Sequence, residues 1–237
     1  MGVCGAGGLK SFFLTGLFFL ITEYLLKNIE LAERKAELNG YYRLHAPIYD
    51  LTRWTFLFGR NKLVRVLASN LSGKPPKTIL DVGCGTGKNV IALKRAFPDA
   101  QVVGCDLSDA MLARAQAAVK HSLNPREMSK IELINASILT LKDRQFDLIV
   151  CSYMLSMTGD SLEPILHNIR RRLNPKGKLA VVDFNFSALS MFRRWMRVNH
   201  VSLDGSVLRA LALCAKVERQ ELHQAFGIWN WFLWIGR

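Results

Sequence analysis

The sequence predicts an α/β fold, a Rossmann-like, doubly wound and mostly parallel seven-stranded sheet with an antiparallel C-terminal hairpin, plus an N-terminal membrane-anchor helix. Apolar segments of strand length alternate with helical patterns between residues 77 and 184. Strands that are apolar along their whole length are typical of parallel sheets covered by helices on both faces. The third observation, an apolar run near the N-terminus, predicts the anchor.

The apolar run covers residues 11–26, SFFLTGLFFLITEYLL, and lies between Lys10 and Lys27. A helix that spans a bilayer needs about 20 apolar residues. This run is shorter and contains Glu23, so spanning the membrane and lying in its interface both remain open. No small-residue cleavage site follows, so we expect the anchor to be retained. The basic residues on one side of it place the domain in the cytoplasm, whereas a buried helix is the alternative.

Charge and cysteine usage narrow the class of protein. Lys and Arg outnumber Asp and Glu by 32 to 19, a net charge of +13, which favours anionic partners such as nucleic acid or an anionic membrane surface. Five widely spaced cysteines form no CxxC pair, so neither a disulfide framework nor a zinc site is expected. We expect the cysteines to be free, and those near strands to be buried.

The elements are expected in the following order. Residues 1–40 form the anchor and a charged helix, residues 41–74 a helical acceptor-side cap, and residues 75–237 the main domain. Strands are predicted at residues 77–83, 101–107, 130–136, 146–153 and 178–184, with helices near 89–96, 110–121 and 163–173. Two further strands are expected around a turn near Phe226 and Gly227.

A glycine-rich loop, DVGCGTG at residues 81–87, joins the first predicted strand to its helix. Glycines let the backbone turn tightly and let a ligand approach the amide groups at the carboxyl edge of a strand. Asp106 ends the second strand 19 residues after Gly87, where an acidic side chain can bind ribose hydroxyls. The spacing GxGxG lacks the last glycine of the dinucleotide-binding pattern.

With CDLSDAML and FDLIVCSY in the expected order, residues 75–237 resemble the class I S-adenosylmethionine-dependent methyltransferases. The resemblance implies S-adenosyl-L-methionine as cofactor and a role for each matching residue. Neighbours of its methionine part would be Asp81, Gly83, Gly85 and Gly87. Asp106 would bind the ribose, Leu107 and Met111 would form walls of the adenine pocket, Asn135 and Ala136 would contact the adenine edge, and Ser152 and Tyr153 would line the methyl-donor end.

Aromatic and basic residues mark the acceptor side. Tyr42, His45 and Tyr49 follow spacings of three and four, which share one helix face for binding an acceptor or equally for packing. Tyrosine faces stabilise a methylated ammonium through cation–π attraction, and His45 is the candidate base that takes the proton of an amine. The chemistry needs no metal, because the sulfonium is already electrophilic.

A closer resemblance rests on residues 41–60, 146–157 and 181–205, which look like the betaine-lipid N-methyltransferases. That family implies a membrane lipid substrate with an amine head group, and places His200 in the acceptor region. It is similar in turn to phosphatidylethanolamine N-methyltransferases and to quinone C-methyltransferases. Asn185 departs from the family pattern, where we expect Gly, and this departure permits a different acceptor.

The sequence bears on three alternatives to lipid N-methylation. A membrane-bound quinone-ring C-methyltransferase would keep the donor site without amine-binding aromatics. A nucleic-acid methyltransferase is not expected, because CSYML stands after the fourth strand in place of an NPPY-type tetrapeptide. A non-catalytic membrane-attached binding protein would have a degraded donor loop, whereas this loop is intact. The sequence indicates no particular oligomeric state.

Overall fold

The computed structural model describes residues 57–237. The predicted anchor, residues 41–56 of the acceptor-side cap, and with them Tyr42, His45 and Tyr49 lie outside the described residues. Within residues 57–237, no helix combines the length and the apolar character that crossing a bilayer requires.

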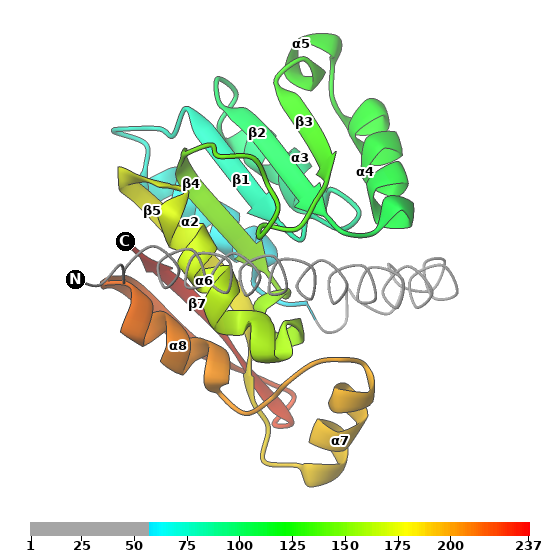
Figure 1. Ribbon diagram of the computed structural model, residues 1–237, viewed down its shortest axis with the longest axis vertical. Helices are drawn as coiled ribbons and strands as arrows, with labels where there is room; N and C mark the ends of the chain where they lie inside the picture. The colour runs from blue at the N-terminus through cyan, green and yellow to red at the C-terminus, as the bar shows by residue number, and fades with distance from the viewer. Residues whose placement is uncertain (1–56) are drawn as a thin grey trace, which may run out of the picture.

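A seven-stranded sheet in the order β3-β2-β1-β4-β5-β7-β6 forms the centre of the protein (Figure 1). The first five strands in this order are parallel, and β7 pairs antiparallel with both β5 and β6. The predicted mixed sheet with an antiparallel C-terminal hairpin is therefore confirmed. The strands are β1 (Thr78–Val82), β2 (Gln101–Asp106), β3 (Ile131–Asn135), β4 (Phe146–Ser152), β5 (Leu173–Phe186), β6 (Val217–Ala225) and β7 (Trp229–Gly236).

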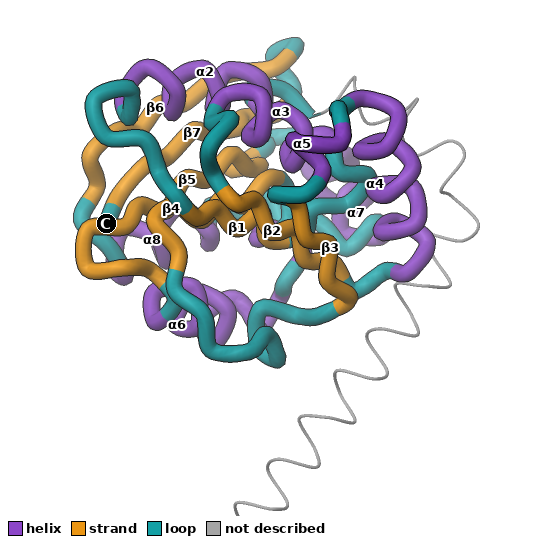
Figure 2. The backbone as a smooth tube through the Cα atoms, turned by 90° about the horizontal axis from the view of Figure 1, so that it is seen from above, coloured by secondary structure: helices purple, strands orange, loops and turns teal. Residues whose placement is uncertain are grey.

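Helices cover both faces of the sheet, with α2 and α3 on one side and α6 and α8 on the other (Figure 2). The structure adds three helices that the sequence pattern did not resolve: the short α5 before β3, and α7 and α8 between β5 and β6. The α-helices are α2 (Arg60–Asn70), α3 (Lys88–Ala96), α4 (Asp109–Ser122), α5 (Pro125–Met128), α6 (Leu162–Arg171), α7 (Ser190–Val198) and α8 (Ser206–Cys214), and short 3-10 turns η1 (Leu155–Met157) and η2 (Gly159–Ser161) follow β4.

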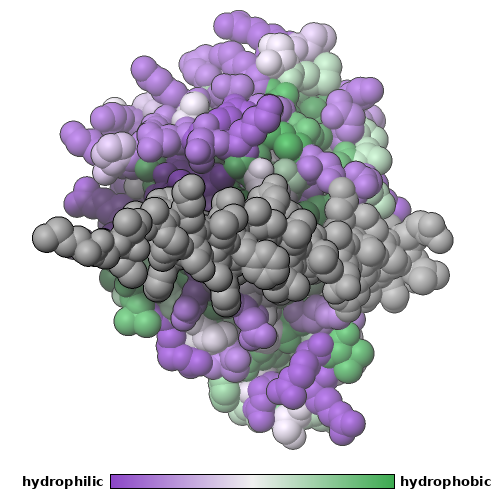
Figure 3. Space-filling view, in the orientation of Figure 1, coloured by the Kyte–Doolittle hydropathy of each residue, from purple (hydrophilic) through white to green (hydrophobic). Residues whose placement is uncertain are grey.

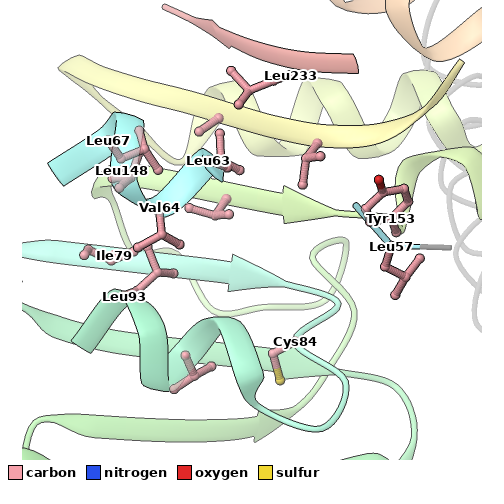
Figure 4. Packing of buried hydrophobic residues seen from close by; sticks show 14 of the residues in the cluster. Leu57, Leu63, Val64, Leu67, Ile79, Cys84, Leu93, Leu148, Tyr153 and Leu233 are labelled. Carbon is pink, nitrogen blue, oxygen red and sulfur yellow. The ribbon is translucent and has the colours of Figure 1, made fainter. Parts of the chain in front are cut away.

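Alternation along the strands explains these two layers. Ile79 belongs to the buried cluster under α2 and α3, whereas Leu80, the next residue, belongs to the cluster under α6 and α8. Because successive side chains point to opposite faces, a strand that is apolar throughout requires cover on both. Figure 4 shows Leu63 and Leu67 of α2 packed near Leu148 of β4.

Asp147 ties three strands together at the amino edge of the sheet. Its Oδ2 accepts hydrogen bonds from the amides of Lys77 (2.8 Å) and Thr78 (3.1 Å), and its Oδ1 accepts one from Asn174 Nδ2 (2.7 Å). Burial opposes ionisation, but these hydrogen bonds lower the pKa of the Asp147 carboxyl overall. The amino edge is thus held by a charged group, which leaves the carboxyl edge for ligands.

The C-terminal hairpin turns at Phe226 and Gly227, as predicted. Both residues have positive φ, 52° and 70°, and the Ile228 amide donates to the Ala225 carbonyl across 2.9 Å. Two consecutive positive φ angles are typical of a type I′ turn, which matches the twist of antiparallel strands. Three of the free cysteines, Cys84, Cys105 and Cys151, are buried, as expected.

Candidate active site

The glycine-rich loop leaves β1 at the carboxyl edge and is fixed to the neighbouring strand. The amides of Gly83 and Cys84 both donate to the Cys105 carbonyl at the end of β2, across 2.8 and 3.0 Å. Gly87 begins α3 with φ at 77°, and a Cβ there would lie 3.0 Å from Ala115 Cβ. The loop can therefore follow this path only with a residue that tolerates positive φ and lacks a side chain.

Asp106 connects this loop to the segment that follows β2. Its Oδ2 accepts a hydrogen bond from the Gly85 amide (2.8 Å), and its Oδ1 accepts one from the Ser108 amide (2.9 Å). The structure thus brings Asp106, the residue predicted to bind the ribose, against the glycine-rich loop. Gly85 has φ at 54°, and a Cβ built on it meets no heavy atom within 4 Å. The open side of the loop therefore lies next to the carboxylate.

Asp81 is a completely buried acid at the start of the loop. Neither carboxylate oxygen has a hydrogen-bond partner. Burial raises the pKa of Asp81 to about 7; the nearby Asn89 side chain and the Arg60 charge oppose this rise, and the negative charge of Asp106 adds to it. A buried acid without partners is costly unless a cation or a donor satisfies it. The site therefore suits a ligand that carries a positive group near the loop.

The predicted adenine-side residues lie together at the ends of β2 and β3. The Ala136 amide donates to the Asp106 carbonyl (3.1 Å), and Asn135 Nδ2 donates to Asp109 Oδ1 (2.5 Å) and to the Leu107 carbonyl (3.3 Å). Asn135 is exposed. Met111, in the first turn of α4, is buried. These bonds hold the Asn135 side chain against the loop between β2 and α4.

The two residues predicted to line the methyl-donor end differ in their surroundings. Asn89 Nδ2 in α3 donates to Ser152 Oγ across 2.7 Å, which links the end of β4 to the donor loop. Tyr153 is only 2% exposed, packs edge-on against Phe184, and donates from its hydroxyl to the Phe58 carbonyl across 2.6 Å. The Tyr153 side chain therefore fixes the segment entering α2 from within the core.

The acceptor side contains one group that the sequence analysis missed. Asp183, near the end of β5, is buried and accepts hydrogen bonds at Oδ2 from the amides of Leu155 (2.9 Å) and Ser156 (3.1 Å). Burial raises the pKa of Asp183 to about 6. An acidic residue inside the apolar run VVDF was the signal that could have identified it. Asp183 positions the backbone that follows β4.

His200 is exposed and follows α7 with φ at 60°. Two residues later, the Ser202 amide donates to the Ser156 carbonyl (2.8 Å), so the segment after α7 lies beside the turn that Asp183 holds. The structure thus places His200 near the carboxyl edge. Tyr42, His45 and Tyr49 stay predictions. Among residues 57–237, no three His, Cys, Asp or Glu side chains are grouped to hold a metal ion.

This fold and site define a Rossmann-like enzyme that binds a nucleoside-containing cofactor at the carboxyl edge of its sheet. Residues 79–177 match the family model described as a methyltransferase domain. The chain is 31% identical over 165 residues to a 2-phytyl-1,4-naphtoquinone methyltransferase of Trichormus variabilis, covering 67% of this chain and 71% of the relative. It is 35% identical over 140 residues to a demethylmenaquinone methyltransferase of Thermus thermophilus, covering 59% and 62%.

A solved structure shares the fold. The N-methyltransferase NodS of Bradyrhizobium japonicum, in complex with S-adenosyl-L-homocysteine, superposes with a TM-score of 0.58 at 22% identity, covering 75% of this chain and 85% of NodS. The chain belongs to the S-adenosylmethionine-dependent methyltransferases. The finer resemblance to betaine-lipid N-methyltransferases is not confirmed, because the relatives named above are quinone methyltransferases.

S-adenosylmethionine is the cofactor, and the residues present fit it. The methionine part carries an ammonium group, which matches the buried and unpartnered Asp81 carboxylate. Gly85 leaves space beside the Asp106 carboxylate, which suits two ribose hydroxyls. The assignment of each residue to a part of the cofactor stays a prediction.

Proposed function

We propose that this protein transfers the methyl group of S-adenosylmethionine to a ring carbon of a prenylated quinol. The observation that carries the proposal is the relative named as a 2-phytyl-1,4-naphtoquinone methyltransferase, of which this chain covers 71%. This acceptor was the alternative expected from the sequence, and the relatives favour it over the amine of a lipid head group. A relative named as a demethylmenaquinone methyltransferase supports the same class of acceptor.

The chemistry sets the oxidation state of the acceptor. S-adenosylmethionine supplies a methyl group bound to a positively charged sulfur, and the carbon of this methyl group accepts an electron pair from the acceptor. An oxidised quinone ring is electron-poor, so the reduced quinol is the form that can donate this pair. Loss of a hydroxyl proton raises the electron density at the neighbouring ring carbon. The new carbon–carbon bond forms as the carbon–sulfur bond breaks, and the proton on that ring carbon then leaves to restore the aromatic ring.

Two features of the protein suit this reaction. A base is required to take the hydroxyl proton and the ring proton. Among the described residues, His200 is our candidate for this base, because it lies in the segment that is hydrogen-bonded to Ser156 beside the end of β4. His45, outside the described residues, is the second. Asp183 holds the adjoining turn after β4 through the Leu155 and Ser156 amides, and so fixes the backbone against which the segment containing His200 lies.

The test uses the full chain in detergent, methyl-labelled S-adenosylmethionine, a prenylated demethyl-naphthoquinone and a total polar lipid extract. We expect label in the naphthoquinone fraction, and only after chemical reduction of the acceptor. Label in an amino-lipid, or equal labelling of the oxidised quinone, would overturn the proposal. Asp81→Asn is the donor-site control, and Asp99→Asn, a change at a fully accessible carboxylate, is its matched surface control.

A further inference from the structure

Helix α7 exposes large apolar side chains to solvent. Met191, Trp195 and Val198 are 84%, 48% and 74% exposed, and their spacing of four and three places them on one face of the helix. Soluble surfaces rarely gather such side chains unless the patch contacts another molecule. Together with three neighbouring exposed residues they form what we call the docking face. Its members are Phe186, Leu189, Met191, Trp195, Val198 and Phe226.

The exposed face of α7 is not needed to hold the helix on the protein. The opposite side already supplies the packing, since Phe192 stacks on Trp229 with ring centroids 5.3 Å apart, and Met196 is buried. Arg193 fixes the start of the helix by donating to the Ser187 carbonyl (2.6 Å). The helix is therefore apolar on two sides, and only one of them serves the core.

Phe226 supplies an independent observation. It is 74% exposed and has φ at 52° in the turn between β6 and β7. Asn or Gly is preferred at this position of a type I′ turn, because positive φ is strained for a bulky side chain. Its ring contacts those of Phe58 and Trp229, with centroids 5.8 and 5.7 Å apart, yet most of the side chain stays exposed on a strained backbone, which makes it available for a further contact.

The turn and α7 lie side by side. Ser187 Oγ donates to the Ile228 carbonyl across 2.6 Å, which joins the segment before α7 to the residue after the turn. Because β6 runs parallel to β5, this turn lies at the same carboxyl edge as the glycine-rich loop. Figure 1 shows α7 and the turn before β7 at the lower end of the molecule, and Figure 3 shows hydrophobic and hydrophilic atoms side by side there.

The charges around the docking face favour an anionic partner. Arg194 and Arg197 are exposed on α7, and residues 184–203 contain no Asp or Glu. Guanidinium groups pair with phosphate, while Trp, Met and Phe side chains enter the boundary between head groups and acyl chains. We propose that the docking face binds the surface of an anionic lipid bilayer. This orientation turns the carboxyl edge, with its donor loop, toward the membrane.

The proposal goes beyond the methyl-transfer activity and is tested without it. The full chain is mixed with vesicles of phosphatidylcholine containing phosphatidylglycerol, or of phosphatidylcholine alone, and amide hydrogen exchange is measured by mass spectrometry. We expect peptides covering residues 187–199 and 225–228 to exchange more slowly on the anionic vesicles only. This readout is local, so binding through residues 1–56 does not produce it.

Two variants sharpen the test. Arg194→Gln combined with Arg197→Gln should weaken binding to anionic vesicles by about tenfold or more. The matched control, Lys120→Gln with Arg126→Gln, removes the same charge near α5 at the opposite end of the molecule (Figure 1) and should bind as the unaltered chain does. Phe226→Asn should still fold, because the preference of Asn for this turn offsets the loss of the ring contacts with Phe58 and Trp229, and it should lose the protection at residues 225–228.

Three outcomes would overturn the proposal. The first is vesicle binding without slowed exchange in α7 and the turn. The second is an equal loss of binding in the arginine pair and its control, which would assign the effect to net charge alone. The third is slowed exchange that depends on protein concentration and needs no vesicles, which would assign the docking face to a second copy of the chain.

Discussion

Replacing Asp81 with Asn should separate stability from cofactor binding. The carboxyl is buried, neither oxygen has a hydrogen-bond partner, and burial raises its pKa from an ordinary 3.8 to about 7. In the native protein it is therefore protonated up to about neutral pH, whereas in the unfolded chain it ionises near 3.8. Since the native state binds more protons between these values, the free energy of unfolding falls as the pH rises through this window.

The magnitude follows from the two pKa values. A rise from 3.8 to about 7 corresponds to a cost of about 4 kcal/mol once Asp81 is ionised in both states. Between about pH 5 and about pH 8 the change is roughly 2.5 kcal/mol. Asp81→Asn removes this dependence, because Asn does not titrate. The variant should thus gain roughly 2.5 kcal/mol relative to the unaltered protein over that interval, whatever its stability at the lower pH.

Urea unfolding at about pH 5 and about pH 8 measures this difference, and Asp99→Asn serves as the exposed control. Isothermal titration with S-adenosylhomocysteine should show weakened binding for Asp81→Asn at about pH 8, where the carboxyl of the unaltered protein is ionised and pairs with the ammonium group, and a smaller loss at about pH 5. If the difference in unfolding free energy between Asp81→Asn and the unaltered protein is the same at the two pH values, the raised pKa of Asp81 is refuted. Unchanged cofactor affinity would refute its place at the ammonium.

Further predictions concern the donor loop and the core. Gly85→Ala and Gly159→Ala each place a Cβ in open space at a φ near 55°, so each should lower the free energy of unfolding in urea by about 1 kcal/mol. Only Gly85→Ala should weaken S-adenosylhomocysteine binding, by about tenfold or more. Equal affinities of the two variants would refute the role of the glycine-rich loop in cofactor binding. Tyr153→Phe should lower the free energy of unfolding by about 1 kcal/mol through the lost hydrogen bond to Phe58, which an unaltered urea midpoint would contradict. In the unaltered protein, affinity for S-adenosylhomocysteine should rise from about pH 6 to about pH 8 as Asp81 ionises, and a flat profile would argue against this linkage.

The donor side was predictable because local sequence determines it. The DVGCGTG loop and Asp106 come from consecutive segments of one strand–helix–strand unit, so their order in the chain fixes their order in space. The hydrogen bond between the Gly85 amide and Asp106 is the product of that order. The apolar strands likewise predicted the layers, since their alternation requires cover on both faces.

The acceptor side was less predictable because it depends on contacts between distant segments. Tyr153 was expected at the methyl-donor end, yet its hydroxyl reaches Phe58, 95 residues away in sequence. Asp183 is an acid that only the fold brings to the Leu155 and Ser156 amides. The hydrophobic periodicity of a single segment cannot predict a hydrogen bond between two residues that are far apart in the sequence. Likewise, the sequence predicted a turn at Phe226, but it predicted neither the positive φ of this residue nor the position of α7 beside it.

The antiparallel strand β7 has a consequence for protein engineering. It lies between β5 and β6, so the segment that contains α7 and α8 leaves the sheet after β5 and returns at β6 without interrupting the donor half, β3-β2-β1. Residues 187–216 therefore form an insert whose two ends are fixed by β5 and β6, the strands on either side of β7, and whose buried Val207 and Leu211 must be matched to the core they cover. Transplanting this insert between related enzymes would exchange the surface they present to their surroundings, while the cofactor-binding half of the sheet stays unchanged.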